Sequence, residues 1–124
     1  MKSFKILFLL VSALSLSACT SVKLVNLTQE PIPAESRQSI EVAIMKGCKA
    51  KGWTPIKADN NTIDAYITVR SHKAHVRISY DEHFYNINYV DSTNLDYSDG
   101  EIHRNYNKWV HKLAASIQQQ LSSQ

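Results

Sequence analysis

Apolar residues along this chain follow three spacings, and each spacing predicts a different kind of segment. Residues 6–16 form a nearly unbroken apolar run, steps of three and four recur over residues 36–51 and again from residue 102 onward, and alternation fills the region between. Side chains repeat about every 3.6 residues in a helix and about every 2 in a strand. The pattern therefore predicts an apolar leader followed by a helix, several strands and a second helix.

The first helix is predicted over residues 36–51. Apolar residues recur at helical steps from Ile40 to Cys48, and Gly52 is placed to end the helix. Gly47 lies within this stripe, where glycine costs roughly 1 kcal/mol relative to alanine. We therefore expect another element to approach the helix closely at Gly47.

Four antiparallel strands are predicted between the two helices. Their expected bounds are residues 53–58, 63–70, 75–80 and 85–89, with turns at 59–61 and 81–83. Pro55 cannot donate a ladder hydrogen bond, which places the first strand at an edge of the sheet. The strands are expected to follow one another as a meander.

The alternation also predicts how the strands pair, because a slip by one residue would turn the apolar side chains to solvent. Between the second and third strands, the expected partners are Val69 with Val76, Ile67 with Ile78 and Ala65 with Tyr80. Between the third and fourth, they are Tyr80 with Tyr85, Ile78 with Ile87 and Val76 with Tyr89. Both registers gather the large apolar residues on one face.

The last helix is predicted to begin at a capping box formed by Ser98 and Glu101. Apolar residues then recur at helical steps from Ile102 to Leu121, which gives the helix a stripe that buries well against a sheet. Both helices are expected on the apolar face of the meander. The predicted fold class is α+β, a two-layer sandwich of helix, four-stranded antiparallel meander and helix.

The opposite face of the meander is predicted to be polar. It would carry Tyr66, Thr68, Arg70, His75, Arg77, Ser79, Asn86 and Asn88. In the following loop, residues 91–97, Leu95 and Tyr97 either pin the loop over the core edge or form a recognition lip beside an exposed sheet edge. The candidate partner-binding residues are Arg70, His75, Arg77, Asn86, Asn88, Ser92 and Asn94.

Residues 1–18 have the layout of a secretory signal peptide: two lysines, an apolar run, then small residues before Cys19. The run is shorter than the roughly 18 residues that span a bilayer. Residues 16–19, Leu-Ser-Ala-Cys, resemble the bacterial lipobox. This resemblance implies cleavage before Cys19, its lipidation with fatty acids such as palmitate, and, because Thr20 follows instead of Asp, a place on the periplasmic face of the outer membrane. Residues 19–34 would then be a tether, in which residues 20–27 can pair as a short strand, and 35–124 a single domain.

Net charge argues against one class of function. The chain has 14 basic and 11 acidic residues, and removal of Lys2 and Lys5 with the leader leaves 12 against 11, a net charge of +1. Nucleic-acid-binding domains are strongly basic and cluster their cations. We therefore expect no nucleic-acid partner.

Candidate chemistry is sparse. The five histidines lack the spacing of a metal motif, and the chain has no nucleophile elbow and no glycine-rich phosphate loop. Cys48 lies on the apolar stripe of the first helix, where a lone cysteine behaves as a small hydrophobe; the alternative is a reactive thiol in an oxidising periplasm. We expect no enzyme activity, no metal site and no cofactor.

Several motifs resemble those of small proteobacterial lipoproteins of uncharacterised function. They are Gly52-Trp53, residues 70–80, Ile87-x-Tyr89, Ser92-x-Asn94-Leu95 and Ile102-His103-x-x-Tyr106-Asn107-x-Trp109-Val110. The resemblance covers most of the mature domain and implies no catalytic residues. The sequence favours a lipid-anchored binding or scaffolding module with an envelope protein or cell-wall partner; the alternative is a small-ligand or metal carrier.

Overall fold

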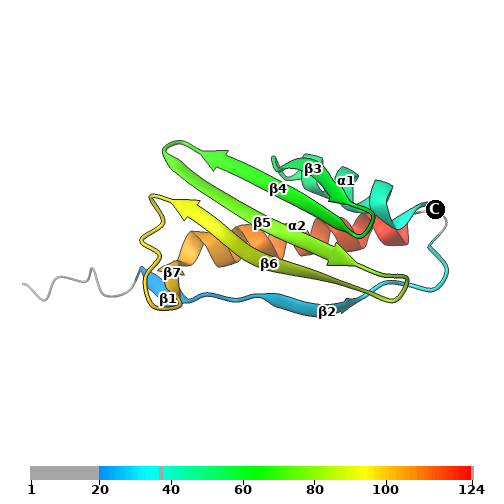
Figure 1. Ribbon diagram of the computed structural model, residues 1–124, viewed down its shortest axis with the longest axis horizontal. Coiled ribbons are helices and arrows are strands. Elements are labelled where there is room, and N and C mark those ends of the chain that lie inside the picture. The colour runs from blue at the N-terminus through cyan, green and yellow to red at the C-terminus, as the bar shows by residue number, and fades with distance from the viewer. Residues whose placement is uncertain (1–19, 37, 124) are drawn as a thin grey trace, which may run out of the picture.

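The computed structural model describes residues 20–36 and 38–123, so the predicted leader and Cys19 lie outside the described residues (Figure 1). In chain order the elements are β1 (Ser21–Lys23), β2 (Leu27–Pro31), α1 (Ile40–Ala50), β3 (Thr54–Asp59), β4 (Thr62–Val69), β5 (His72–Tyr80), β6 (Phe84–Thr93), β7 (Glu101–His103) and α2 (Arg104–Ser122). The fold is α+β, as predicted. It contains a five-stranded antiparallel sheet of order β2-β6-β5-β4-β3 and a separate β1-β7 pair.

The helices and the five-stranded sheet form two layers, with both helices on one face of the sheet (Figure 1). The close approach predicted at Gly47 of α1 is confirmed, because a Cβ there would lie 2.8 Å from the backbone Cα of Ile117 in α2. The hydroxyl of Ser116 donates a hydrogen bond to the Gly47 carbonyl at 2.9 Å. Glycine therefore allows the two helices to touch.

The β5–β6 register is confirmed, with Tyr80 opposite Tyr85, Ile78 opposite Ile87 and Val76 opposite Tyr89. The predicted β4–β5 register is wrong: Ile63 lies opposite Ile78, Ala65 opposite Val76 and Ile67 opposite Ala74. The structure closes this hairpin with a two-residue turn in which Arg70 has a φ of 57°. The same residues still face the core, because the partners differ from those predicted by an even number of positions.

Residues 21–31, expected to belong to a tether, mostly lie in strands. β2 pairs with β6 as a fifth strand, and β1 pairs with β7. Asparagine side chains fix the chain between them: Asn107 accepts from the Val25 amide at 3.1 Å and Asn26 accepts from the Tyr89 amide at 2.9 Å. The described fold thus already includes residues 21–31, which precede the predicted start of the domain at residue 35.

The capping box predicted at Ser98 and Glu101 is also corrected. These two residues exchange backbone hydrogen bonds of 3.0 and 2.9 Å across a tight turn, with Asp99 and Gly100 at positive φ. An Asp-Gly pair favours such a turn between paired strands. The helix α2 begins later, at Arg104, where the ring of His103 accepts from the Asn105 amide.

Candidate functional site

The outer face of the sheet, which the helices do not cover, carries a group of four interacting side chains. Asp64 accepts hydrogen bonds from His75 Nε2 at 3.1 Å and from Arg77 Nε at 3.0 Å, and the rings of Tyr66 and His75 stack with centroids 4.2 Å apart. The pairing of β4 with β5 brings these side chains together, because Tyr66 lies opposite His75 and Asp64 lies opposite Arg77. We call these four residues the sheet-face cluster.

Asp64 is the electrostatic centre of the sheet-face cluster. Burial alone would raise the pKa of Asp64, but the hydrogen bonds and positive charges of His75 and Arg77 outweigh it and lower this pKa below its ordinary value. The Arg77 side chain is 51% exposed. A guanidinium has five N–H donors and Asp64 uses only Nε, so the Nη donors of Arg77 can serve a partner.

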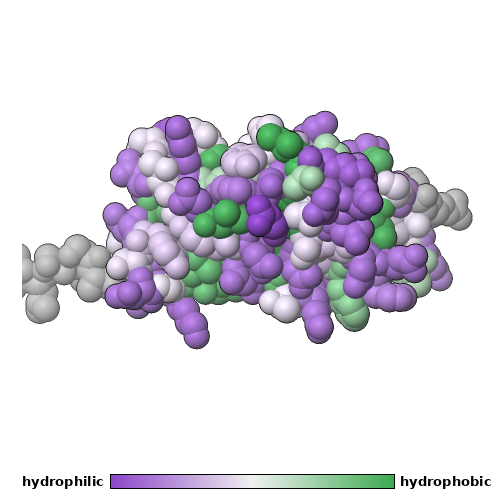
Figure 2. Space-filling view, viewed as in Figure 1, coloured by the Kyte–Doolittle hydropathy of each residue, from purple (hydrophilic) through white to green (hydrophobic). Residues whose placement is uncertain are grey.

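A shallow hollow of about 210 Å³ lies beside the cluster, where β4, β5 and β6 run next to one another. Its rim includes Tyr66, His75, Lys73 and Asp91, close to the β-bulge at His75 and Val76. Typical small-molecule pockets measure roughly 300–1,000 Å³. The hollow is therefore smaller than a typical small-molecule pocket, and Figure 2 shows this side of the molecule as mainly hydrophilic with scattered apolar side chains.

Three of the seven candidate partner-binding residues lie together. His75 and Arg77 belong to the sheet-face cluster, and Asn88 lies exposed on β6 opposite Arg77. This much of the candidate site follows from the alternation of polar residues along β5 and β6.

The other four candidates lie elsewhere or hold the fold together. Asn86 bonds Ser79 and the Gln29 amide, Ser92 bonds the Tyr89 hydroxyl, and Asn94 donates to Ser71. Arg70 is in the β4–β5 turn. Asn86 nevertheless lies on the same outer face as Asn88, two residues away on β6, and Ser92 lines the hollow beside the sheet-face cluster, whereas Arg70 and Asn94 lie in loops.

The sequence placed Tyr66 on the polar face of the sheet, but neither Tyr66 nor Asp64 was among the candidate partner-binding residues. With the predicted β4–β5 register, Tyr66 would face Ser79 and not His75. The signal that could have revealed the pairing is the Arg70-Ser71 turn, but arginine rarely adopts the positive φ that it has here.

The loop after β6 is shorter than expected, because β6 runs to Thr93 and includes residues 91–93. Leu95 is 1% exposed and belongs to the core, while its carbonyl accepts from the His103 amide at 2.8 Å. Tyr97 stacks on Tyr89 with ring centroids 4.6 Å apart and is 49% exposed. Leu95 therefore pins the loop, and Tyr97 is held on its surface.

His72, His103 and Cys48 have local structural roles. The ring of His72 contacts the Asn94 carbonyl at 2.7 Å, and His103 caps α2. Among the residues that the structure describes, no three His, Cys, Asp or Glu side chains are grouped to hold a metal ion. Cys48 is buried and unpaired as a small core hydrophobe, and burial raises the pKa of its thiol to about 12.

No family model, curated protein or solved structure matches this chain. In the described part of the chain, no helix is both long and apolar enough to cross a membrane.

Proposed function

We propose that this chain is a lipid-anchored binding or scaffolding module of the bacterial envelope, without enzyme activity, cofactor or nucleic-acid partner. It would be held by lipidated Cys19 on the periplasmic face of the outer membrane and contact an envelope protein or cell-wall component. Two observations support the anchor: the lipobox-like residues 16–19, and the resemblance to small proteobacterial lipoproteins.

The observation that carries the binding role is the sheet-face cluster. Tyrosine and arginine are enriched among the residues that dominate protein interfaces, and here Tyr66 and Arg77 are half-exposed side chains of one cluster. Stacking on His75 and the bond to Asp64 hold them in place before a partner arrives. Such preorganisation reduces the entropy lost on binding.

The anchor can be tested by mass spectrometry of the mature protein purified from membranes. We expect an amino-terminal Cys19 that carries diacylglycerol and an amide-linked acyl chain. An intact leader, or an unmodified thiol at position 19, would contradict the proposed anchor.

The binding face can be tested by cross-linking in intact cells, with a photoreactive residue in place of the exposed Asn88. We expect a cross-linked product that falls at least tenfold in Tyr66→Ala and Arg77→Ala. Phe84→Ala and Lys46→Ala are matched controls, since both residues are exposed and lie outside the sheet-face cluster. An undiminished product in the Tyr66 and Arg77 variants would exclude the cluster as the binding face.

A small-ligand or metal carrier is the second candidate, favoured by the contact of His75 with Asp64 beside the hollow. Two ligands from the protein leave other positions of a metal to solvent or substrate. Titration of the full chain with zinc and copper tests it: binding at micromolar metal that disappears in His75→Ala would support this candidate, and no binding would remove it.

A further inference from the structure

The helix α2 carries positive charge that the rest of the domain does not share. Its sequence contains Arg104, Lys108 and Lys112 and no Asp or Glu. The residues that follow the leader include 12 basic and 11 acidic side chains. Without the three cations of α2, 9 basic residues remain against 11 acidic ones. Because the three are spaced by four residues, they form one stripe along the helix, and all three are exposed.

This stripe is not explained by the stability of the helix. The amino-terminal end of a helix has a partial positive charge, so cations placed there are unfavourable, and the first turn of α2 has no acidic residue. Within residues 20–36 and 38–123, the ion pairs are Lys57 with Glu41, and His75 and Arg77 with Asp64. The stripe therefore remains available to an anionic partner.

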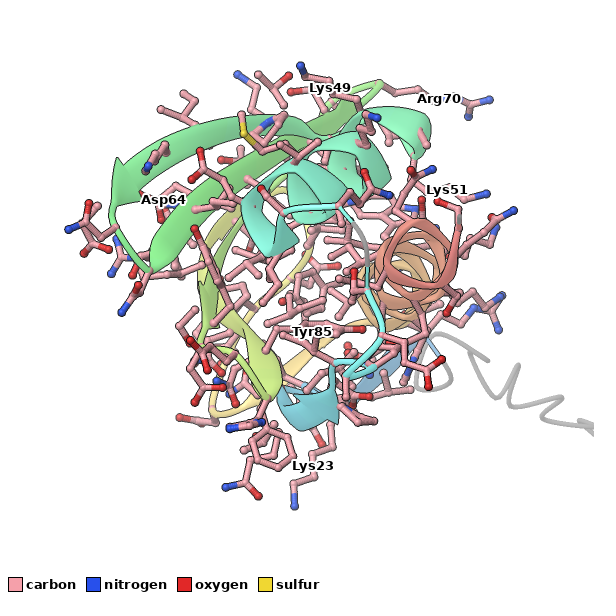
Figure 3. All side chains as sticks on the ribbon, turned by 90° about the vertical axis from the view of Figure 1, so that its right-hand side faces the viewer. Lys23, Lys49, Lys51, Asp64, Arg70 and Tyr85 are labelled. Atoms are coloured by element: carbon pink, nitrogen blue, oxygen red, sulfur yellow. The ribbon has the colours of Figure 1, made fainter. Side chains whose placement is uncertain are left out.

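A hollow of about 310 Å³ borders the stripe. It is lined by Lys51, Trp53, Ile67, Val69, Trp109 and Lys112. Two ammonium groups and an apolar lining with tryptophan suit the interfacial region of a bilayer, where phosphates lie next to acyl chains and tryptophan is enriched. Figure 3 shows Lys51 beside α2 and Asp64 on the opposite side of the molecule.

The same end of the domain lies next to the predicted anchor. The amide of Arg104, the first residue of α2, donates to the carbonyl of Thr20 at 2.8 Å. Thr20 directly follows Cys19, and successive Cα atoms are about 3.8 Å apart. A lipid on Cys19 would therefore enter the bilayer within a few ångströms of the start of the stripe, which extends about 12 Å from Arg104 to Lys112.

We propose that the α2 side of the domain, with the stripe and the Lys51–Lys112 hollow, rests on the bilayer and binds the phosphate headgroups of anionic phospholipids. This inference rests on the lipidation of Cys19 in the proposed function. It also gives the anchored domain an orientation: the sheet-face cluster, on the opposite side from α2, points away from the membrane toward a partner.

The two tryptophans of the chain provide the test, because both line the hollow. The lipidated protein is reconstituted in vesicles with a nitroxide on the lipid headgroup, which quenches nearby tryptophan fluorescence. We expect strong quenching in vesicles that contain phosphatidylglycerol, and weak quenching in phosphatidylcholine alone or at high salt, which screens surface charges.

The variant Lys108→Gln/Lys112→Gln tests the stripe. Each cation near an anionic surface strengthens attraction about fivefold, so the ratio of membrane-apposed to detached orientations should fall roughly 25-fold. Lys57→Gln/Lys73→Gln is the matched control, with the same change in charge on β3 and β5. This control should be quenched like the wild type.

Equal quenching of the two double variants, or equal quenching in neutral and anionic vesicles, would overturn the orientation. This outcome is distinguishable from failure of the proposed function. Mass spectrometry of Cys19 tests the anchor, and cross-linking at Asn88 tests the sheet face; neither depends on Lys108 or Lys112.

Discussion

The two sides of the domain use positive charge differently. On the sheet side, Arg77 and His75 share Asp64 through hydrogen bonds of 3.0 and 3.1 Å. On the α2 side, Lys108 and Lys112 form no ion pair with any described residue. Paired charges in fixed geometry give specificity, whereas unpaired surface charges give a diffuse attraction that salt weakens. This difference supports the proposed specific partner at the sheet and the proposed lipid surface at α2.

The largest effect should come from Gly47→Ala, which is expected to disturb the α2 side of the domain and to leave the sheet side unchanged. The new Cβ meets the Ile117 backbone at 2.8 Å and cannot be accommodated by a rotamer change. Overpacking costs about 1–3 kcal/mol, here near the upper end because backbone must move, and helix propensity returns about 1 kcal/mol. We expect the free energy of unfolding to fall by roughly 2 kcal/mol in urea denaturation.

The neighbouring Lys46→Ala on α1 is the control for Gly47→Ala and should change stability by less than about 0.5 kcal/mol, since Lys46 is exposed. Displacement of α1 should also move Lys51 away from α2 and weaken headgroup quenching of tryptophan, while the sheet-face cluster keeps its cross-linking at Asn88. Unchanged stability of Gly47→Ala would show that the helices are not in close contact.

A smaller effect is expected from Tyr106→Phe, which alters the core beneath both sides. The Tyr106 hydroxyl is buried without a hydrogen-bond partner among the described residues, and burial raises the pKa of this group. An unpaired buried hydroxyl costs about 1–3 kcal/mol. We expect Tyr106→Phe to be more stable than the wild type by about 1 kcal/mol in the same urea assay.

Tyr85→Phe is the matched control for Tyr106→Phe. The Tyr85 hydroxyl contacts the Ala114 carbonyl at 3.4 Å and Gln118 at 3.3 Å, so its removal loses two long hydrogen bonds. It should lower the free energy of unfolding by about 0.5 kcal/mol. A Tyr106→Phe variant less stable than Tyr85→Phe would contradict the assignment of an unpaired hydroxyl.

Alternation predicted the sheet side well and the anchor end poorly. The tyrosines and isoleucines of β5 and β6 fix which face of these strands is buried, and the predicted register is observed there. The predicted β4–β5 register buries the same face but is wrong. The strands β1 and β7 have three residues each, too few to show a period. Ser98 to Glu101 matches both a capping box and an Asp-Gly turn, and pairing of β7 with β1 decides between them.

The candidate site was predicted only in part for a related reason. His75, Arg77 and Asn88 could be placed on one face from the sequence, because a strand places alternate residues on opposite faces. The partners of His75 could not, because they depend on a turn at Arg70 with a φ of 57°. The α2 stripe escaped notice because its cations are four residues apart and form no run in the sequence.

The smallest effect is expected from Asp64→Asn, which would leave Arg77 without a carboxylate partner, like the cations of α2. Arg77 is half exposed, so the pair contributes about 0.5–1 kcal/mol at neutral pH. The pKa of Asp64 is lower in the folded state than its unfolded value of about 3.9. This stability is therefore present above pH 4 or so and is lost as the pH falls through the folded pKa.

Urea denaturation of wild type and Asp64→Asn from neutral pH down to acid should show this loss as two curves that converge below about pH 4. The pKa of Asp81 is also lowered, by backbone hydrogen bonds from His83 and Phe84, but Asp81 titrates in both proteins and cancels from the difference. A difference that stays constant through the acid range would mean that Asp64 holds its partners by shape and not by charge. In that case the two sides would differ only in geometry. High salt would then weaken specificity at the sheet as much in the wild type as in Asp64→Asn.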